Sequence, residues 1–286
     1  MRGWRSTDAG RRSFVRNGLL LTAGAWSLPT YTSLLRLPTV VPQCGIVLNT
    51  VAKNLARDRF GTLYELRRMG YGLVEVNLDK LPPEFYRDAR RAKLLTPVGG
   101  TSLKRLLTEP DVVIREAHKR NCRYVTTYWP WQSGADNLST EEVKQTAGYL
   151  NDIGRQLAAA DLGFTWHNHN KVFASLGNGT AFDRLMAETD PRYVNLQLDV
   201  YWAARGGQDP TAIMLAHAGR VPLLHLKDIN AEDKYDCVGA GRLDVAGILA
   251  ARETAGTIYT MVEVDKTEEE FNCARTSLET IKVNLP

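Results

Sequence analysis

The chain has 286 residues, of which 44% are hydrophobic and 24% are charged. This composition excludes a disordered chain, a collagen-like repeat and a small disulfide-rich scaffold. The formal net charge of +4 does not indicate a nucleic-acid-binding protein, because the first 36 residues alone hold six arginines and one aspartate. The remainder is near neutral and has no basic block that could follow a phosphate backbone. We therefore expect no nucleic-acid partner.

The N-terminal segment has the pattern of an export signal. Arg11 and Arg12 precede Ser-Phe-Val, and a short apolar run broken by glycine and threonine follows. A basic flank, a short apolar run and small residues make up a signal peptide, and the arginine pair resembles the twin-arginine signal. Ala23-Gly24-Ala25 is the candidate cleavage site. We expect folding in the cytoplasm and passage through the twin-arginine export machinery to a periplasmic or extracellular location. An uncleaved anchor or a basic disordered tail is the alternative, although the run is short for a membrane span.

The four cysteines are far apart and form no C-x-x-C motif; they are Cys44, Cys122, Cys237 and Cys273. A periplasmic location permits disulfides, but four cysteines allow three pairings and the spacing does not choose among them. We expect buried free thiols. No cysteine–histidine cluster indicates a structural zinc ion.

Short β-rich runs alternate with amphipathic helical patterns along the rest of the chain. The predicted strands are Gly45–Asn49, Leu73–Asn77, Leu95–Gly99, Tyr124–Tyr128, Gly163–His167, Val194–Asp199, Pro222–His225 and Ile258–Glu263. The predicted helices include Phe60–Met69, Pro83–Arg91, Asp111–Arg120, Thr140–Ala159, Ala181–Thr189 and Thr211–Ala218. Strands that alternate with helices indicate a parallel sheet.

Eight such strands in about 240 residues is the number in a closed (β/α)8 barrel. A doubly wound open sheet is the alternative, and it would usually carry G-x-G-x-x-G after its first strand. Asn49-Thr50-Val51-Ala52-Lys53 stands there instead. We therefore predict an α/β protein with a single-domain (β/α)8 TIM barrel over residues 40–286. Residues 1–30 would hold the signal peptide and the start of the mature chain.

Four consecutive predicted strands end in residues that can bind a metal ion. In such barrels the active site lies at the C-terminal ends of the strands, where His167, Asp199, His225 and Glu263 stand. Imidazoles together with carboxylates suit Mn²⁺, Co²⁺, Zn²⁺, Fe²⁺ or Mg²⁺. Each residue also has a structural interpretation, since an aspartate after a strand can cap the next helix. Their occurrence on four successive strands predicts a site for one divalent metal ion.

Six segments carry a resemblance to a known family: Gly45-Ile46-Val47-Leu48-Asn49-Thr50-Val51, Gly70-Tyr71-Gly72-Leu73-Val74-Glu75, His167-Asn168-His169, Leu198-Asp199-Val200-Tyr201-Trp202-Ala203, His225-Leu226-Lys227-Asp228 and Val262-Glu263-Val264-Asp265. In this order they resemble the xylose isomerase-like TIM barrels, the sugar phosphate isomerases/epimerases. That family holds one divalent metal with Glu, Asp, His and Glu from its last four strands. The resemblance implies Asp199, His225 and Glu263 as ligands, with His167 or its neighbour His169 in place of the first glutamate.

The chain departs from the family pattern at three places. Val172 stands where the subgroup has the glutamate of an H-N-H-x-x-E-F run, and Gly239-Ala240-Gly241 replaces Gly-Glu-Gly after the seventh strand. Thr101-Ser102-Leu103 stands where a histidine often follows the third strand. These departures affect the acid/base groups more than the metal site.

The resemblance implies proton transfer on a carbon next to a carbonyl. A metal that binds the carbonyl and a neighbouring hydroxyl stabilises the enediolate, while side chains remove and return the proton. Glu263 is the candidate base, and His167 or His169 is its partner on the opposite face. Lys227 would hold a sugar hydroxyl or steady the enediolate; its structural interpretation is a surface ion pair with Asp228.

Candidate substrate-binding residues surround these groups. Trp129 and Trp202, with Trp131 and Tyr201, would form an apolar wall for a sugar ring, or would simply pack in the core. Glu75, at the end of the second strand, would accept a hydrogen bond from a sugar hydroxyl or from a backbone amide. Asp265 is the remaining candidate.

The predicted function is a metal-dependent sugar isomerase or epimerase that acts through an enediolate of a sugar or polyol derivative. The alternative is a lyase or dehydratase acting on a keto-sugar, an inosose or a 3-keto-glycoside, because loss of a β-substituent can follow the same deprotonation. A non-catalytic carbohydrate-binding barrel is the second alternative, which Val172 and Ala240 suggest. A nuclease of this fold would need more metal ligands than the five histidines allow, since His118 and His217 fall in predicted helices and are interpreted as surface residues. The expected partner is a small sugar or glycoside; the oligomeric state, a homo-oligomer included, stays open.

Overall fold

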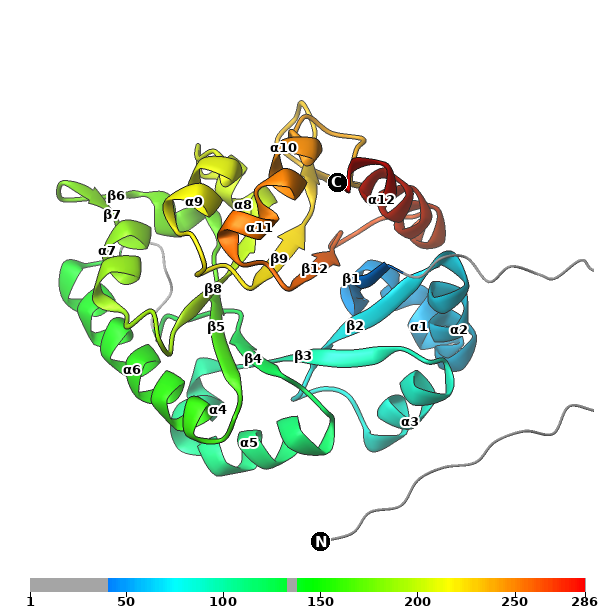
Figure 1. Ribbon diagram of the computed structural model, residues 1–286, viewed down its shortest axis with the longest axis horizontal. Coiled ribbons are helices and arrows are strands. Elements are labelled where there is room, and N and C mark those ends of the chain that lie inside the picture. Colours follow the sequence, from blue (N-terminus) through cyan, green and yellow to red (C-terminus); the bar gives the residue numbers. More distant parts are fainter. Residues whose placement is uncertain (1–40, 133–137, 286) are drawn as a thin grey trace, which may run out of the picture. The chain divides into compact units, whose positions relative to one another are not determined.

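The computed structural model describes residues 41–132 and 138–285. Within them a closed barrel of eight parallel strands is surrounded by helices (Figure 1). The barrel strands are β1 Val41–Val47, β2 Tyr71–Asn77, β3 Leu95–Thr101, β4 Tyr124–Thr127, β5 Gly163–His167, β8 Asn195–Asp199, β9 Leu223–Leu226 and β12 Tyr259–Val262. Because β12 pairs with β1, the sheet closes, and the predicted TIM barrel is confirmed. The predicted export signal lies outside the described residues.

The helices connect successive strands on the outside of the barrel. They are α1 Ala52–Arg57, α2 Arg59–Met69, α3 Pro83–Arg91, α4 Leu103–Thr108, α5 Pro110–Lys119, α6 Thr140–Ala159, α7 Ala181–Glu188, α8 Val200–Arg205, α9 Pro210–Ala216, α10 Val245–Ala250, α11 Arg252–Ala255 and α12 Glu270–Asn284. All six predicted helices are present with small shifts at their ends. The prediction missed α12, which is 15 residues long, and the short helices α1, α4, α8, α10 and α11. In the described part of the chain, no helix has the length and apolar character needed to cross a membrane.

Small additional elements decorate the barrel. They are two 3-10 helices, Leu48–Val51 and Asn170–Phe173, and two pairs of two-residue antiparallel strands, β6 Ser175–Leu176 with β7 Gly179–Thr180 and β10 Asp228–Ile229 with β11 Tyr235–Asp236.

Apolar side chains fill both the barrel and the layer between strands and helices. Inside the barrel, five residues from different strands form one cluster: Val47, Leu73, Val98, Leu223 and Met261. Gly45 of β1 lies against this cluster, and a Cβ there would be 2.5 Å from Leu73 Cδ1 and from Met261 Sδ. The interior is therefore packed, as in other barrels of this class, and the space for chemistry lies at the strand ends.

The long helix α6 shows how the outer layer forms. Its buried residues include Val143, Leu150, Ile153 and Leu157, whose spacing places them on one face of a helix. Ser139 caps its N-terminus by accepting a hydrogen bond from the Glu142 N–H. The sequence pattern therefore defines both the start of α6 and the face that packs on the barrel.

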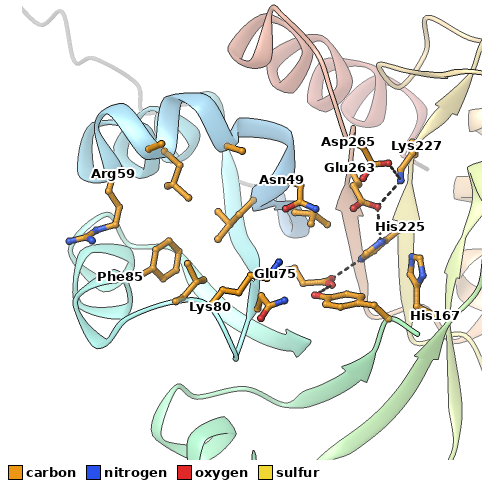
Figure 2. Close-up of a pocket in the computed structure, with 18 of the residues that line it drawn as sticks. Asn49, Arg59, Glu75, Lys80, Phe85, His167, His225, Lys227, Glu263 and Asp265 are labelled. Carbon is orange, nitrogen blue, oxygen red and sulfur yellow. Dashed lines mark hydrogen bonds and ion pairs between the residues drawn. The ribbon is translucent and has the colours of Figure 1, made fainter. Parts of the chain in front are cut away.

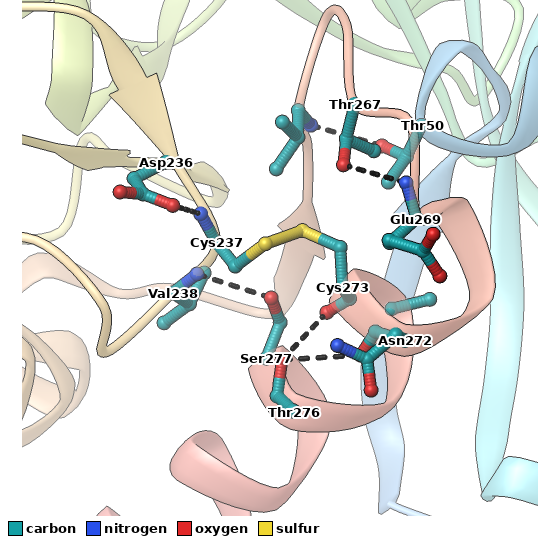
Figure 3. Close-up of a disulfide and its surroundings, with 12 residues drawn as sticks. Thr50, Asp236, Cys237, Val238, Thr267, Glu269, Asn272, Cys273, Thr276 and Ser277 are labelled. Carbon is teal, nitrogen blue, oxygen red and sulfur yellow. Dashed lines mark hydrogen bonds between the residues drawn. A yellow bond between two sulfur atoms is a disulfide. The ribbon is translucent and has the colours of Figure 1, made fainter.

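One disulfide joins two of the late elements. Cys237, just after β11, is bonded to Cys273 of α12, 36 residues further along the chain (Figure 3). Beside it, the Val238 N–H donates to Ser277 Oγ of α12 over 3.0 Å. The prediction of free thiols is confirmed for Cys44 and Cys122, which are free and buried. It was wrong for the other pair, because sequence spacing does not reveal that α12 returns to this loop.

Candidate active site

The four predicted ligand residues converge at the C-terminal end of the barrel. His167, Asp199 and Glu263 end or follow strands β5, β8 and β12, and His225 lies in β9. All four side chains are buried, and one donor atom from each lies within 4.8 Å of the others. The parallel sheet brings them together because every strand of a barrel points its C-terminal end to the same face.

Asp199 has two separate roles. Its Oδ1 accepts a hydrogen bond of 2.9 Å from the Trp202 N–H and so caps α8. Its backbone N–H donates to Asn168 Oδ1 over 2.8 Å, and its carbonyl accepts from Asn168 Nδ2, which fixes the peptide. The second carboxylate oxygen, Oδ2, remains directed at the cluster. The structural and the metal-binding interpretations of this residue are therefore compatible.

Buried atoms without hydrogen bonds favour a cation in this cluster, beside the ion-pair contacts that His167 and Lys227 make with Asp199 Oδ2. Both ring nitrogens of His167 and Oδ2 of Asp199 are buried and make no hydrogen bond with any described residue. His167 Nε2 and Asp199 Oδ2 lie 3.5 Å apart. Buried polar atoms normally have partners, because leaving them unpaired costs free energy. A divalent metal ion would satisfy these atoms, and the imidazole and carboxylate donors are of the type that such ions bind.

His225 is held between two carboxylates. Its Nδ1 lies 3.1 Å from Glu263 Oε2, and its Nε2 lies 2.9 Å from Glu75 Oε2. Burial lowers the pKa of His225, but the charges of Glu75 and Glu263 outweigh burial and raise the pKa well above its ordinary value. The site thus has a strongly negative potential, which also attracts a metal cation.

Lys227 is a buried ammonium among these carboxylates, with an exposed fraction of 1%. Its Nζ lies 2.9 Å from Glu263 Oε2, 2.9 Å from Asp265 Oδ2 and 3.4 Å from Asp199 Oδ2. Burial lowers the pKa of Lys227, but these carboxylates outweigh it and raise the pKa above the ordinary value. For Glu263, burial raises the pKa, while Lys227 and His225 together bring it well below the ordinary value.

The expected surface ion pair between Lys227 and Asp228 is not formed. Asp228 is itself buried and accepts hydrogen bonds from the backbone N–H groups of Ile229, Gly239 and Leu243. It thereby organises the loop after β10. Successive side chains of an extended chain point to opposite sides, so Lys227 points away from Asp228 and toward the site.

The balance of charge in the site favours a divalent cation. Four carboxylates gather there, from Glu75, Asp199, Glu263 and Asp265, and Lys227 is the ammonium that contacts three of them. Metal binding requires neutral imidazoles and so displaces the proton that the raised pKa of His225 favours. With neutral imidazoles the group carries three excess negative charges. Buried charge without compensation is costly, so a doubly charged ion fits this set better than another monovalent side chain does.

Glu75 has a different environment from the one predicted. Its carboxylate is 1% exposed, and its Oε1 accepts a hydrogen bond of 2.8 Å from the Tyr128 hydroxyl. Its Oε2 accepts one of 2.9 Å from Gln197 Nε2 and also faces His225. Both oxygens are therefore engaged within the protein. Glu75 acts on His225 and also lines the cavity, so its contact with a sugar hydroxyl stays a prediction.

The groups around Glu75 were not found from the sequence. Tyr128 follows β4, and its ring fits against Gly100 of β3, where a Cβ would lie 2.0 Å from the ring. Gln197, in the middle of β8, is held by the Thr126 hydroxyl, which donates to Gln197 Oε1 over 3.1 Å. A glutamine that interrupts the apolar run Leu196–Leu198 is a weak signal of an inward polar contact.

His169 stands beside the cluster between two tryptophans. Its ring centroid is 5.2 Å from that of Trp129 and 5.2 Å from that of Trp202, and 4.9 Å from that of His167. Burial and then the neighbouring His167 lower the pKa of His169 to about 3. Its imidazole is therefore neutral at physiological pH, and it is a neighbour of the metal-binding group rather than a member.

Two of the four aromatic residues predicted to line the site instead belong to the core. Trp131 and Tyr201 are fully buried, and the Tyr201 hydroxyl donates to the Asp233 carbonyl. Trp202 lines the cavity at the site, whereas Trp129 touches His169 from outside that lining.

The three departures from the family pattern fill structural positions. Val172 is buried in the hydrophobic core. The Thr101 hydroxyl donates to Asp79 Oδ1, and Ser102 caps α4. Ala240 is an exposed residue of the loop that Asp228 organises. None of the three supplies an acid or a base. His118 is exposed on α5, as expected, and His217 is half-buried against Phe182.

A cavity of about 710 Å³ opens onto the cluster (Figure 2). Its polar end is lined by His167, His169, His225, Lys227 and Glu263, with Trp202 and Asp265 beside them. The volume is within the range of about 300–1,000 Å³ that is usual for small-molecule sites. The arrangement can therefore hold a metal ion and a small polar substrate together, with an ionised carboxylate and a buried ammonium beside the substrate.

Comparison with characterised proteins gives partial matches in sequence. No family model matches the chain. An inosose dehydratase of Clostridium beijerinckii is 32% identical over 107 residues, which is 36% of this chain and 34% of that protein. An inosose dehydratase of Lactiplantibacillus plantarum is 28% identical over 145 residues, which is 44% of this chain and 48% of that protein. The matches thus span between about a quarter and a half of the length of the curated relatives.

Solved structures match over most of the fold. A sugar phosphate isomerase/epimerase from Parabacteroides distasonis has a TM-score of 0.73 at 19% identity and covers 87% of this chain and 97% of its own. An L-ribulose 3-epimerase has a TM-score of 0.66 at 15% identity, with coverage of 85% and 94%. The IolI protein, solved with a bound zinc atom, has a TM-score of 0.64 at 14% identity, with coverage of 85% and 96%. At these identities the likeness establishes the fold.

Proposed function

We propose that this protein is a metal-dependent enzyme that removes a proton from the carbon next to a carbonyl in a sugar or cyclitol derivative. The observation that carries the proposal is the buried group of His167, Asp199, His225 and Glu263, whose donor atoms converge within 4.8 Å and three of which line the cavity. When bound by these four residues, a divalent metal ion would act as a Lewis acid toward the carbonyl.

Glu263 is the proposed base. Lys227 and His225 keep its carboxylate ionised at neutral pH, and it faces the cavity. A carboxylate with a pKa well below the ordinary value is a weak base, so it can take a proton only from a C–H bond that is already acidified. This requirement fits a substrate with a carbonyl next to the reacting carbon.

Lys227 and Asp265 are proposed to hold the substrate oxygens. Lys227 Nζ carries several N–H donors and is held in place by three carboxylates, so it needs little reorganisation when negative charge develops nearby. Asp265 has a side chain that is 33% exposed at the cavity, and it can accept a hydrogen bond from a hydroxyl. Trp202 provides an apolar surface for a ring.

The fate of the proton decides the class of reaction. Return of the proton by a second group gives isomerisation or epimerisation, and His167 or the neutral His169 is the nearest candidate for that group. Loss of a β-hydroxyl instead gives dehydration. The partial likeness to inosose dehydratases favours dehydration.

The first experiment measures metal content in the protein purified without added metal, beside the His225→Ala variant. We expect about one equivalent of a divalent metal in the native protein and its loss in the variant. Incubation with keto-cyclitols and ketoses in D2O then tests the chemistry. Deuterium in recovered substrate or epimer supports proton return, and an unsaturated product supports dehydration.

Glu263→Gln tests the proposed base. Because Glu263 is also a proposed metal ligand, the metal content of the variant is measured beside its activity. We expect a variant loaded with metal to bind substrate and to lose deuterium exchange, with Glu65→Gln, a half-buried residue of α2 outside the cavity, as the control. Metal binding without exchange on any carbonyl substrate would leave the carbohydrate-binding barrel as the function. No metal in either protein, even after soaking with Mn²⁺, Co²⁺ or Zn²⁺, would contradict the mechanism.

We also propose that the protein works outside the cytoplasm. The twin-arginine pattern at Arg11 and Arg12 supports this location, and the disulfide between Cys237 and Cys273 is a bond that persists in oxidising compartments. Cell fractionation tests it: the native chain should reach the periplasm or the medium, and an Arg11→Lys, Arg12→Lys double variant should remain inside.

A further inference from the structure

The cavity continues well beyond the polar site. From His225 and Glu263 it extends toward α1 and the connection between β2 and α3, where apolar side chains line it together with Asn49, Lys80 and Arg59 (Figure 2). We call this end the apolar arm; it is formed by Ala52, Leu55 and Ala56 of α1 with Leu81, Pro82 and Phe85 on the opposite side. The site that holds the proposed metal occupies only one end of the cavity.

Helix α1 is built to line this space. Ala52, Leu55 and Ala56 have the spacing i, i+3, i+4, which places them on one face of a helix. None of the six residues of α1 is fully buried, so this apolar face is not covered by the protein core. An apolar face that lines a cavity continuous with a polar site is suited to an apolar part of a ligand.

The wall formed by α1 is held firmly from the other side. Glu270 of α12 accepts hydrogen bonds from the Lys53 and Asn54 N–H groups over 2.8 and 2.9 Å. Two charged residues, Arg59 and Lys80, also line this end of the cavity. Arg59 is neutralised because its Nε donates to Asp88 Oδ2 over 2.8 Å, and Lys80 is exposed to solvent. The arm is therefore preformed and carries no uncompensated charge from Arg59.

We propose that the apolar arm binds an apolar substituent on the sugar or cyclitol, so that the substrate is a glycoside with an apolar aglycone rather than a free polyol. This inference rests on the proposed function, because the ring must occupy the polar end beside Lys227 and Asp265. The substituent then lies between α1 and Leu81, where its transfer from water contributes to binding.

The test compares phenyl β-D-glucopyranoside with methyl β-D-glucopyranoside by calorimetry on the metal-loaded protein. We expect the phenyl glycoside to bind at least about tenfold more tightly, a difference of about 1.4 kcal/mol. In a protein with labelled leucine methyl groups, NMR contacts should run from the phenyl protons to Leu55 and Leu81. Ala56→Trp fills the arm and should remove the phenyl advantage while methyl glycoside binding persists.

Two controls keep the outcome clear. Ala158→Trp places the same bulk on an exposed position of α6 and should leave both affinities unchanged. Ala52→Leu fills the arm with less bulk, and should reduce the advantage if Ala56→Trp does not fold. Equal affinities for the two glycosides, or phenyl contacts away from Leu55 and Leu81, would contradict the proposal that the apolar arm binds the substituent, while the proposed function would stand. If neither glycoside nor any free keto-cyclitol binds, the proposed function fails as well.

Discussion

At the scale of single residues, Glu75 determines which ring nitrogen of His225 carries the proton and which one faces the cluster. A proton on Nε2 that is donated to Glu75 leaves the lone pair on Nδ1, the nitrogen that faces Glu263. Carboxylates that orient a metal-ligating histidine in this way are common around metal sites. Tyr128 and Gln197 hold the glutamate in turn, so the orientation of one imidazole depends on three side chains, from β2, from β8 and from the residue after β4.

Glu75→Gln should weaken metal binding by about 10- to 100-fold, the usual cost of losing such a partner. The amide keeps the size of the side chain and loses the charge that faces His225. The measurement is a competition titration of Zn²⁺ against a chelator, with folding checked by thermal melting. Tyr128→Phe is the matched control, because it removes only the hydrogen bond to Oε1 and should weaken binding less. Unchanged zinc affinity in Glu75→Gln would rule out the orienting role.

The residues of the site differ in how far they could be predicted. His167, Asp199, His225 and Glu263 could be placed because the strand pattern and the rule for strand ends together locate them. The partners of Glu75 could not, because contact between β2 and β9 runs across the barrel interior and leaves no periodic signal in the chain. Lys227 was placed correctly near the site, but its burial among carboxylates follows from tertiary packing.

At the scale of elements, α12 ties the last part of the chain to the first. Through Glu270 it binds the backbone of α1, and through Cys273 it binds the loop after β11 (Figure 3). The sequence did not reveal α12 because two residues of its buried face, Glu270 and Ser277, are polar, which weakens the apolar pattern of the helix. Its partners lie some 216 residues away, at Asn54, and 36 residues away, at Cys237.

Glu270→Gln should destabilise the protein by about 2 kcal/mol. The carboxylate is 5% exposed and accepts three hydrogen bonds, from the Lys53 and Asn54 backbones and from Asn54 Nδ2. Hydrogen bonds to a charged group contribute about 1.5–3 kcal/mol each, and the amide retains part of them. Urea unfolding measures the change, with the exposed neighbour Glu268→Gln as the control. A loss no larger than in that control would contradict the anchoring role.

Reduction of the disulfide should lower the melting temperature by roughly 7 °C. A closed loop of 36 residues restricts the unfolded chain by about 3–4 kcal/mol in the chain-entropy model. Calorimetry with and without dithiothreitol measures the shift, and the Cys237→Ser, Cys273→Ser double variant should melt at the lower temperature in both conditions. If the reductant lowers the melting temperature of the double variant as well, its effect on the native protein does not come from this bond.

At the scale of the whole molecule, stability and chemistry are separated in space. The strand interiors and the helix layer form a dry core, and the titratable groups of the site lie above it at one end of the barrel. Within the core, Cys44 and Cys122 remain as buried thiols. Burial raises the pKa of each to about 12 from an ordinary value of 9.0. The core therefore binds two protons that the unfolded chain releases at lower pH.

This difference predicts a loss of stability in alkali. A group whose pKa is higher in the folded state than in the unfolded chain stabilises the folded protein. Its contribution to the free energy of unfolding is complete below the unfolded pKa, and it falls as the pH rises from 9 toward 12. At pH 10 each thiol should have lost about 1.4 kcal/mol of its contribution. Urea unfolding measures the free energy of unfolding at pH 8 and at pH 10. Its decrease between these two pH values should be about 2–3 kcal/mol smaller in the Cys44→Ala, Cys122→Ala double variant than in the native protein. Tyrosines with ordinary pKa values near 10 contribute mainly at higher pH, which is why the comparison stops there. Equal decreases in the two proteins would mean that these thiols ionise as readily in the folded state as in the unfolded chain.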